Sequence, residues 1–256
     1  MQLNCLHLAT RARRLTVLAV LATALTGCQS ITGSQPFTQV RVIDASPDAP
    51  NLDIYQNSAA GLYNVGFGTV SSYIAVTPGA YVHAAYIANT QQQLAQVRGT
   101  LSSGTQYTVL AGNVAANLQM SVLRDQSTPA PSGQVALRFL GQATRAGAVD
   151  LYLVPSGASL AGIAPIATAV GFGGNTGYIN APGGTYSIVA FPARAVPDLT
   201  APVYTGSQAF YPGGSVRTIV LIDQRNEEQS VEQTDQRPAA LPALQIITAD
   251  DFDPAG

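Results

Sequence analysis

The sequence after residue 37 repeats itself once, and this duplication constrains the fold more than any other feature. The segment Val40–Ile43 recurs 97 positions later as Leu137–Leu140. Other matches keep the same order with a widening spacing: Leu52–Tyr55 with Val149–Tyr152, Val65–Gly68 with Val170–Gly173, Tyr73–Ile74 with Tyr178–Ile179, Pro78–Tyr81 with Pro182–Tyr186, Thr108–Leu110 with Thr218–Val220, and Leu118–Met120 with Leu244–Ile246. A period of about 100 residues indicates a duplicated domain, because solenoid repeats are about 20–50 residues long.

Each copy is predicted to consist of β-strands. Short runs rich in Val, Ile, Tyr and Leu alternate with turn residues, and no stretch of the exported chain keeps a helical apolar period over three turns. These runs are Val40–Asp44, Leu52–Gln56, Tyr81–Ile87, Gln106–Ala111 and Leu118–Leu123, then Val135–Leu140, Val149–Val154, Thr185–Phe191, Val216–Asp223 and Leu244–Thr248. We therefore expect an all-β fold of two tandem β-sandwich domains, immunoglobulin-like or transthyretin-like.

The turn-rich and polar segments predict the domain boundaries. We place the first β-sandwich domain at 38–129 and the second at 134–253, with a linker at 130–133 stiffened by the prolines of Ser127–Gly133. A polar tether at 28–37 precedes the first domain. The charged insertion Arg225–Gln236 is expected to be a solvated loop or an extended hairpin.

The first 27 residues have the pattern of a cleaved export signal. Arg11, Arg13 and Arg14 precede the apolar run Leu15–Leu25, and no acidic residue lies among them. The run is shorter than the roughly 20 residues that a membrane-spanning helix needs. A basic start, a short apolar centre and small residues at a cleavage site predict a secretory signal peptide.

The segment Leu25–Cys28 resembles the lipobox of bacterial lipoproteins. The resemblance implies cleavage before Cys28 and attachment of acyl chains such as palmitate to this residue, and two or more chains anchor a protein durably. Gln29 resembles the residue that follows the cysteine in lipoproteins sorted to the outer membrane. The alternative is an ordinary signal peptide in which Cys28 is incidental.

The composition excludes several function classes. All 12 basic residues are arginines, so Schiff-base chemistry, a lysine general base, the P-loop lysine and Lys–Asn isopeptide crosslinks are absent. A formal net charge of -2 argues against a nucleic-acid partner. Cys5 leaves with the signal peptide and Cys28 carries the lipid, so we expect no disulfide.

The first copy resembles a known family. Val40–Tyr55, Gly66–Gly68 and Pro78–Tyr81 together are similar to the domain-of-unknown-function family 4397. The resemblance implies an exported β-domain of a kind often found in tandem on lipoproteins, and it implies no mechanism. In the second copy the loop corresponding to Asp44–Pro50 is Gly141–Gly147, which lacks the acidic residues.

Three carboxylates, Asp44, Asp48 and Asp53, lie within ten residues of one loop. Such clusters can supply oxygen ligands to a hard cation such as calcium, although the spacing is not that of an EF-hand. We favour a turn in which Asp44 and Ser46 make Asx-type bonds, and keep these aspartates as weak metal candidates. Partner recognition is a further alternative. Asp53 recurs as Asp150, which fits a structural role at a strand entry.

His83 is the one histidine outside the signal peptide. A catalytic triad needs a partner for each ring nitrogen, and the second copy has no counterpart of this residue. We expect a partly buried, hydrogen-bonded histidine on a strand.

The glycine-rich segments Gly66–Gly68 and Gly171–Gly174 are expected to form tight turns with an inward phenylalanine, since no helix follows that could bind phosphate.

Tyr55 and Tyr152 occupy matched positions and are expected at the core or its edge, with a sugar-stacking surface as the alternative. The acidic pairs Glu227–Glu228 and Asp250–Asp251 are expected in a loop or in the tail.

Taken as a whole, these features predict a lipid-anchored envelope protein whose two β-modules bind a ligand or serve a structural role. We predict no enzyme activity, no catalytic residues and no cofactor. The expected partners are the membrane, through the lipid, and an envelope protein or glycan. The alternatives are a carboxylate-based hydrolase of envelope glycans or peptides, which would need a cleft with two perturbed carboxylates, and a subunit of a surface assembly.

Overall fold

The computed structural model describes residues 37–197, 200–224 and 244–254. Within these ranges the regular structure is β-strand, apart from one short 3-10 turn at Ala115–Asn117. The predicted all-β class is confirmed, because the strands form sheets that pack on one another as β-sandwiches. No helix in the described ranges is long and apolar enough to cross a membrane.

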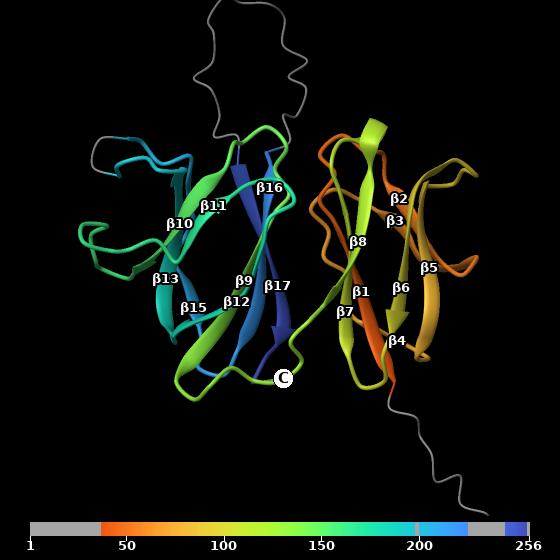
Figure 1. The fold of residues 1–256 in the computed structure, drawn as a ribbon, viewed down its shortest axis with the longest axis horizontal. Helices are drawn as coiled ribbons and strands as arrows, with labels where there is room; N and C mark the ends of the chain where they lie inside the picture. The colour runs from red at the N-terminus through yellow and green to blue at the C-terminus, as the bar shows by residue number, and fades with distance from the viewer. Residues whose placement is uncertain (1–36, 198–199, 225–243, 255–256) are drawn as a thin grey trace, which may run out of the picture. The chain divides into compact units, whose positions relative to one another are not determined.

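The first half of the described chain contains two sheets (Figure 1). Their strands are β1 (Thr38–Asp44), β2 (Leu52–Gln56), β3 (Ala59–Val65), β4 (Ile74–Val76), β5 (Gly79–Ile87), β6 (Gln93–Leu101), β7 (Gln106–Gly112) and β8 (Gln119–Arg124). The strand orders are β4-β1-β7-β8 and β3-β2-β5-β6. β1 runs parallel to β7, and the other neighbours are antiparallel.

The second half also contains two sheets. Their strands are β9 (Gln134–Gly141), β10 (Val149–Pro155), β11 (Ala167–Val170), β12 (Asn175–Pro182), β13 (Gly184–Pro192), β14 (Tyr204–Thr205), β15 (Ala209–Tyr211), β16 (Val216–Asp223) and β17 (Leu244–Phe252). The orders are β12-β9-β16-β17 and β11-β10-β13-β14, with β15 also paired to β13. β9 runs parallel to β16, as β1 does to β7, so both halves have the same strand connectivity.

Each half has its own apolar core between its two sheets. Val40, Val42 and Ile54 contribute to the first core, and Leu137, Phe139 and Leu151 contribute to the second. Strand alternation turns the intervening residues of β1 and β9 to the opposite face of their sheets. Those faces are buried as well, since a third cluster combines residues of both halves: Ile43, Ala45, Leu110, Leu140, Val220, Ile222 and Ala249.

The linker packs against the second half. Ala130 is buried beside Ala136 and Val216, and its N–H donates to the carbonyl oxygen of Gly214 at 3.0 Å. Several sequence predictions lie outside the described residues: the signal peptide 1–27, Cys28, the tether up to residue 36, Glu227–Glu228 and the insertion Arg225–Gln236.

Candidate binding face and buried charge cluster

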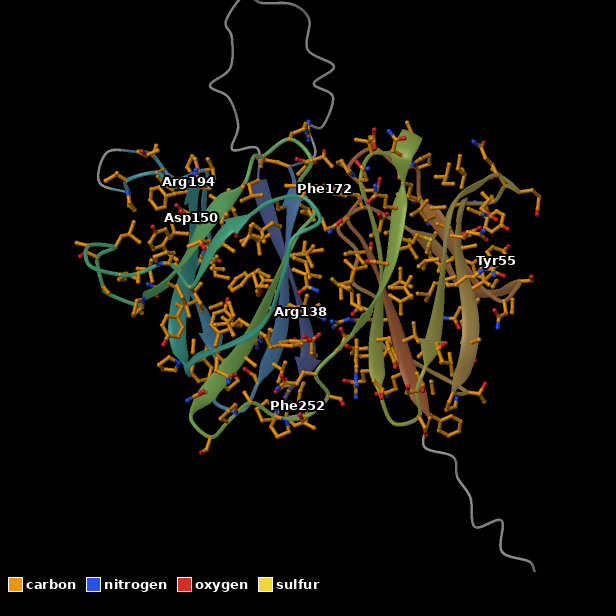
Figure 2. All side chains as sticks on the ribbon, in the orientation of Figure 1. Tyr55, Arg138, Asp150, Phe172, Arg194 and Phe252 are labelled. Carbon is orange, nitrogen blue, oxygen red and sulfur yellow. The ribbon has the colours of Figure 1, made fainter. Side chains whose placement is uncertain are left out.

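Two tyrosines form an aromatic pair on the outer face of sheet β3-β2-β5-β6. The ring centroids of Tyr55 on β2 and Tyr86 on β5 lie 5.0 Å apart, with 63° between the ring planes. Ile54 faces the core, so alternation directs Tyr55 to the other face, and Figure 2 shows it on the outer side of the sheet. Both rings are half-buried, so part of each remains open to solvent.

The tyrosine pair borders a hollow of about 380 Å³. Its lining residues are Tyr55, Asn57, Ser58, Val82, Ala84, Tyr86, Gln93, Gln96 and Arg98. At one end lies the β2–β3 hairpin turn, in which Asn57 and Ser58 have φ of 47° and 68°, the left-handed values of a two-residue turn. The lining is therefore aromatic and amide-rich, with one arginine and no carboxylate. We call this site the tyrosine hollow.

The second half has the equivalent aromatic pair, but it is covered. Tyr152 and Phe191 are T-shaped with centroids 5.6 Å apart, and they are 6% and 3% exposed. Leu160 and Ile163, from the segment between β10 and β11, pack against them. This segment is longer in the second copy, where the spacing between copies widens from 97 to 105 residues. Tyr152 is thus buried as expected of a core-edge ring, whereas Tyr55 stays accessible.

Charged side chains concentrate in a second place, between the halves. Arg138 on β9 donates from Nη2 to Oδ1 of Asp125, which follows β8, at 2.5 Å. Its Nε donates to Oγ1 of Thr218 at 3.0 Å, and the guanidinium lies 4.8 Å from the ring centre of Tyr178. The Arg138 side chain is 3% exposed and that of Asp125 is fully buried. A buried ion pair needs such additional hydrogen bonds to offset its desolvation.

The same constellation occurs a second time with the halves exchanged. Arg41 on β1 pairs with Asp251 on β17, and its Nε donates to Oγ1 of Thr108 at 2.9 Å. The hydroxyl of Tyr73 donates to Asp125 at 2.8 Å, and that of Tyr178 donates to Asp251 at 2.8 Å. Each half thus gives one arginine and one aspartate to the other, as in a two-fold symmetric interface. We call these residues the reciprocal cluster.

The electrostatics of the reciprocal cluster indicate a structural role at the interface between the two halves. Burial raises the pKa of Asp251, and the charge of Arg41 opposes that rise. Burial by itself would lower the pKa of Arg138, but its neighbours Tyr178 and Asp125 raise it. Both carboxylates already accept bonds from arginine, threonine and tyrosine. No substrate could reach these carboxylates without separating the halves.

The sequence prediction for Asp250 and Asp251 is wrong. They were expected in a loop or tail, but they lie in β17, which continues to Phe252. Asp251 belongs to the reciprocal cluster, and Asp250 pairs with Arg217 at 2.8 Å. The alternation of apolar residues stops near Thr248, so the apolar pattern did not reveal that the strand continues through Asp250 and through Asp251, whose side chain is paired across the interface.

The three loop aspartates make separate structural bonds. Oδ1 of Asp44 accepts from the N–H of Ser46 at 2.9 Å, which is the expected Asx turn. Oδ1 of Asp48, which is exposed, accepts from the N–H of Ala115 at 2.7 Å. Among the residues that the structure describes, no three metal-ligating side chains converge. This geometry does not support the hypothesis that Asp44, Asp48 and Asp53 bind a metal ion.

Asp53 and Asp150 perform the same task in the two halves. The Asp53 carboxylate accepts from the N–H groups of Asn64 and Asn89 at 2.8 and 3.0 Å. Asp150 accepts in the same way from Ala169 and Arg194, both at 2.8 Å. All four donors have φ between 52° and 66°, a region that is costly for residues other than glycine. Each carboxylate therefore stabilises two strained backbone positions.

The glycine-rich segments form turns, but their phenylalanines differ. In the first half Thr69 N–H donates to Gly66 O, and Phe67 packs against the apolar cluster shared by both halves. In the second half Gly174 N–H donates to Gly171 O, while Phe172 is 43% exposed. The predicted inward position of phenylalanine is therefore wrong for Phe172.

The environment of His83 also differs from the predicted one. It lies on β5 with no exposed surface, its ring is stacked 5.9 Å from that of Tyr81, and neither ring nitrogen has a hydrogen-bond partner. The expected hydrogen bond is absent because the residue faces the apolar side of the sheet, toward the first core. Burial lowers the pKa of His83 below 6.5, which keeps the ring neutral near pH 7.

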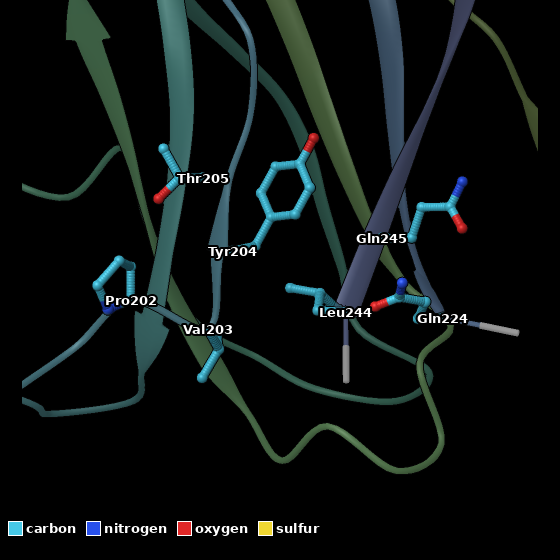
Figure 3. A pocket seen from close by; sticks show the side chains of 7 residues that line it. All are labelled: Pro202, Val203, Tyr204, Thr205, Gln224, Leu244 and Gln245. Atoms are coloured by element: carbon cyan, nitrogen blue, oxygen red, sulfur yellow. The ribbon is translucent and has the colours of Figure 1, made fainter. Parts of the chain in front are cut away.

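Two further hollows lack catalytic groups. One, of about 450 Å³, is lined by Pro202, Val203, Tyr204, Thr205, Gln224, Leu244 and Gln245 (Figure 3). The other, of about 330 Å³, lies beside Phe172 and includes Gln142 and Asn175. Neither lining contains a carboxylate, an arginine or a histidine.

The reciprocal cluster was not predicted from the sequence, although part of the pattern that indicates it is present there. Arg41 and Arg138 stand between apolar residues at the same position of the two copies. Arginine is almost never buried without a partner, so a matched arginine inside an apolar strand predicts a buried acid. That acid lies in the other half, and no local pattern identifies it.

In the part of the chain that the structure describes, fold and site define a β-protein of two sandwiches in which the aromatic pair Tyr55–Tyr86 borders an open hollow. The family model called Domain of unknown function (DUF4397) matches residues 38–152 once, covering the first half and the start of the second. Among curated proteins none matches this chain.

This chain is weakly similar to several solved structures, two of which are a carbohydrate-binding module and an adhesion-type protein. One is a family 26 carbohydrate-binding module of Eubacterium rectale Amy13K, in complex with maltoheptaose. It is 11% identical, covers 77% of this chain and 100% of its own, and has a TM-score of 0.21. The other is a proposed cell adhesion protein of Bacteroides eggerthii. It is 9% identical, covers 87% of this chain and 97% of its own, and has a TM-score of 0.24. Similarities this weak carry no argument about function.

Proposed function

We propose that this chain is an exported protein, anchored to the cell envelope by acyl chains on Cys28, that acts as a binding module. Its two β-sandwich domains span 38–129 and 134–253 and form a tandem pair. The outer membrane is the proposed location, because of Gln29. The apolar run Leu15–Leu25 and the lipobox-like Leu25–Cys28 support export and anchoring.

The observation that carries the binding function is the tyrosine hollow. A concave site lined by aromatic rings and a few polar groups is the usual form of a ligand site. The second half buries the same aromatic pair under a longer segment, so a covered face is compatible with this fold. Leaving Tyr55 and Tyr86 uncovered therefore favours contact with a ligand.

The position of the acidic groups favours binding over hydrolysis. A carboxylate-based hydrolase needs two carboxylates in an open cleft. None of the three hollows has a carboxylate in its lining. Asp125 and Asp251, which are both buried, are enclosed in the reciprocal cluster.

Position-specific crosslinking in intact cells tests this function. The mature chain has no cysteine besides Cys28, so Ser58→Cys places a unique thiol at the rim of the tyrosine hollow. Ser127→Cys, at an exposed position near the linker, is the matched control. A thiol-attached photo-crosslinker should give an envelope adduct from position 58 and none from position 127. Equal adducts, or no adduct at either position, would contradict a binding function of this face.

A further inference from the structure

We infer that the tyrosine hollow binds an oligosaccharide that carries carboxylate groups. This inference rests on the proposed binding function and names the class of its ligand. It is carried by the chemistry of the lining and by the contrast between the two halves.

The shape and the aromatic rings suit a sugar. A pyranose ring has an apolar face of C–H groups that packs on an aromatic ring, and tyrosine offers such a face with a polar end. Tyr55 and Tyr86 are both partly open to solvent, whereas their counterparts Tyr152 and Phe191 are buried. The second half therefore cannot offer the same surface.

The polar groups suit the hydroxyl rim of a sugar. The Tyr86 hydroxyl donates to Oε1 of Gln93 at 2.9 Å, which leaves the amide NH₂ of Gln93 free to donate. Gln96 is exposed beside it, and an amide can both donate to and accept from sugar hydroxyls. The side chain of Asn57 is already engaged, because its Oδ1 accepts from the N–H of Val82 at 2.8 Å.

The positive charge at the tyrosine hollow favours an acidic ligand. Arg98 on β6 is exposed at the rim, and within the described residues it makes no ion pair. No carboxylate lines the site. A guanidinium binds a carboxylate through two parallel hydrogen bonds, which a neutral sugar cannot offer. The complementary ligand is therefore a uronic-acid-type oligosaccharide.

Calorimetric titration of the full mature chain tests this inference. The acidic probes are hexamers of galacturonate, alginate and hyaluronate, and the neutral probe is a galactose hexamer. Binding of at least one acidic probe is expected, with a Kd at least tenfold lower than that for the neutral hexamer. Tyr55→Ala and Arg98→Gln should each weaken acidic binding at least tenfold.

Matched controls separate this site from general effects. Phe210→Ala removes an exposed ring elsewhere, and Arg194→Gln removes an exposed arginine of the second half. Both should change the Kd less than twofold. Since Arg98→Gln alters an exposed side chain, a melting curve like that of the wild type shows that its loss of binding is not unfolding.

Three results would overturn the inference. They are the absence of binding to all acidic probes, equal binding of the neutral hexamer, and acidic binding unchanged by both Tyr55→Ala and Arg98→Gln. If one of these occurs while Ser58→Cys still gives its specific envelope adduct, the ligand class is wrong and the binding function stands. A loss of that adduct would remove the binding function itself.

Discussion

Arg138 of the second half reaches Asp125 of the first, with 2.5 Å between Nη2 and Oδ1 and both side chains shielded from water. Arg41 and Asp251 repeat this relationship in the opposite direction. Together they make the two sandwiches dependent on each other, because separation would break both of these buried arginine–aspartate pairs.

Breaking the reciprocal cluster should be costly. Asp125→Ala leaves the buried Arg138 without its carboxylate, and removing one member of a buried pair typically costs about 3–5 kcal/mol. Asp250→Ala is the control, since the Asp250 side chain is 57% exposed and its pair with Arg217 should contribute less than about 1 kcal/mol. Urea unfolding of both variants checks the difference. Similar losses of stability in the two would contradict the structural role of the cluster.

Cleavage near the linker should not separate the halves. Ser127 and Thr128 are exposed, so a broad-specificity protease should cut there in preference to the buried Ala130. Each half has its own core, and the reciprocal cluster and the shared apolar cluster should hold the fragments together. Size-exclusion chromatography should show the nicked protein at its original volume until denaturant is added. Immediate separation of two folded fragments would show that the interface is weak.

The carboxylate at the start of β2 should stabilise the fold without a metal. Asp53→Ala leaves two N–H donors without their acceptor, at a cost of about 1–3 kcal/mol. Asp48→Ala, at an exposed position, should cost less. Millimolar calcium should leave the melting temperature of the wild type unchanged. A calcium-dependent rise of several degrees that Asp48→Ala abolishes would instead show a cation site.

The protein should lose stability in mild acid because of His83. Its pKa is lowered in the folded state, so below about pH 6.5 the unfolded chain takes up a proton that the folded protein does not. The free energy of unfolding should then fall with decreasing pH, by at most about 1.4 kcal/mol per pH unit. His83→Ile introduces the residue found at the equivalent position 188 and should remove this fall between pH 7.5 and 5.5. An unchanged slope in that variant would assign the effect to other groups.

The anchor is tested independently of the fold. Cys28→Ala should abolish acyl-chain labelling and release the protein from membranes, because the proposed lipid is attached to this residue. Intact mass spectrometry of the native protein should show a chain that starts at an acylated Cys28. An unmodified cysteine, or cleavage elsewhere, would refute the lipobox assignment.

Much of the fold could be predicted from local patterns. Alternation along Val40–Asp44 and Val149–Val154 predicted strands that the structure contains as β1 and β10. The Asx bond of Asp44 was predictable because it joins residues two positions apart. The extension of β17 through Asp251 was not, since a polar residue on a strand indicates solvent unless its partner is known.

The strands and the turns could be predicted from the sequence because they depend on residues close together in the chain, and the repetition could be predicted because the two copies share matching segments in the same order. The tertiary structure decided which strand faces meet. Arg41 and Asp251 are 210 positions apart, and Tyr55 differs from Tyr152 only in what packs above it. Period-two alternation assigns a side chain to one of two faces, but whether water, a loop or the other half covers that face depends on packing between segments distant in the chain.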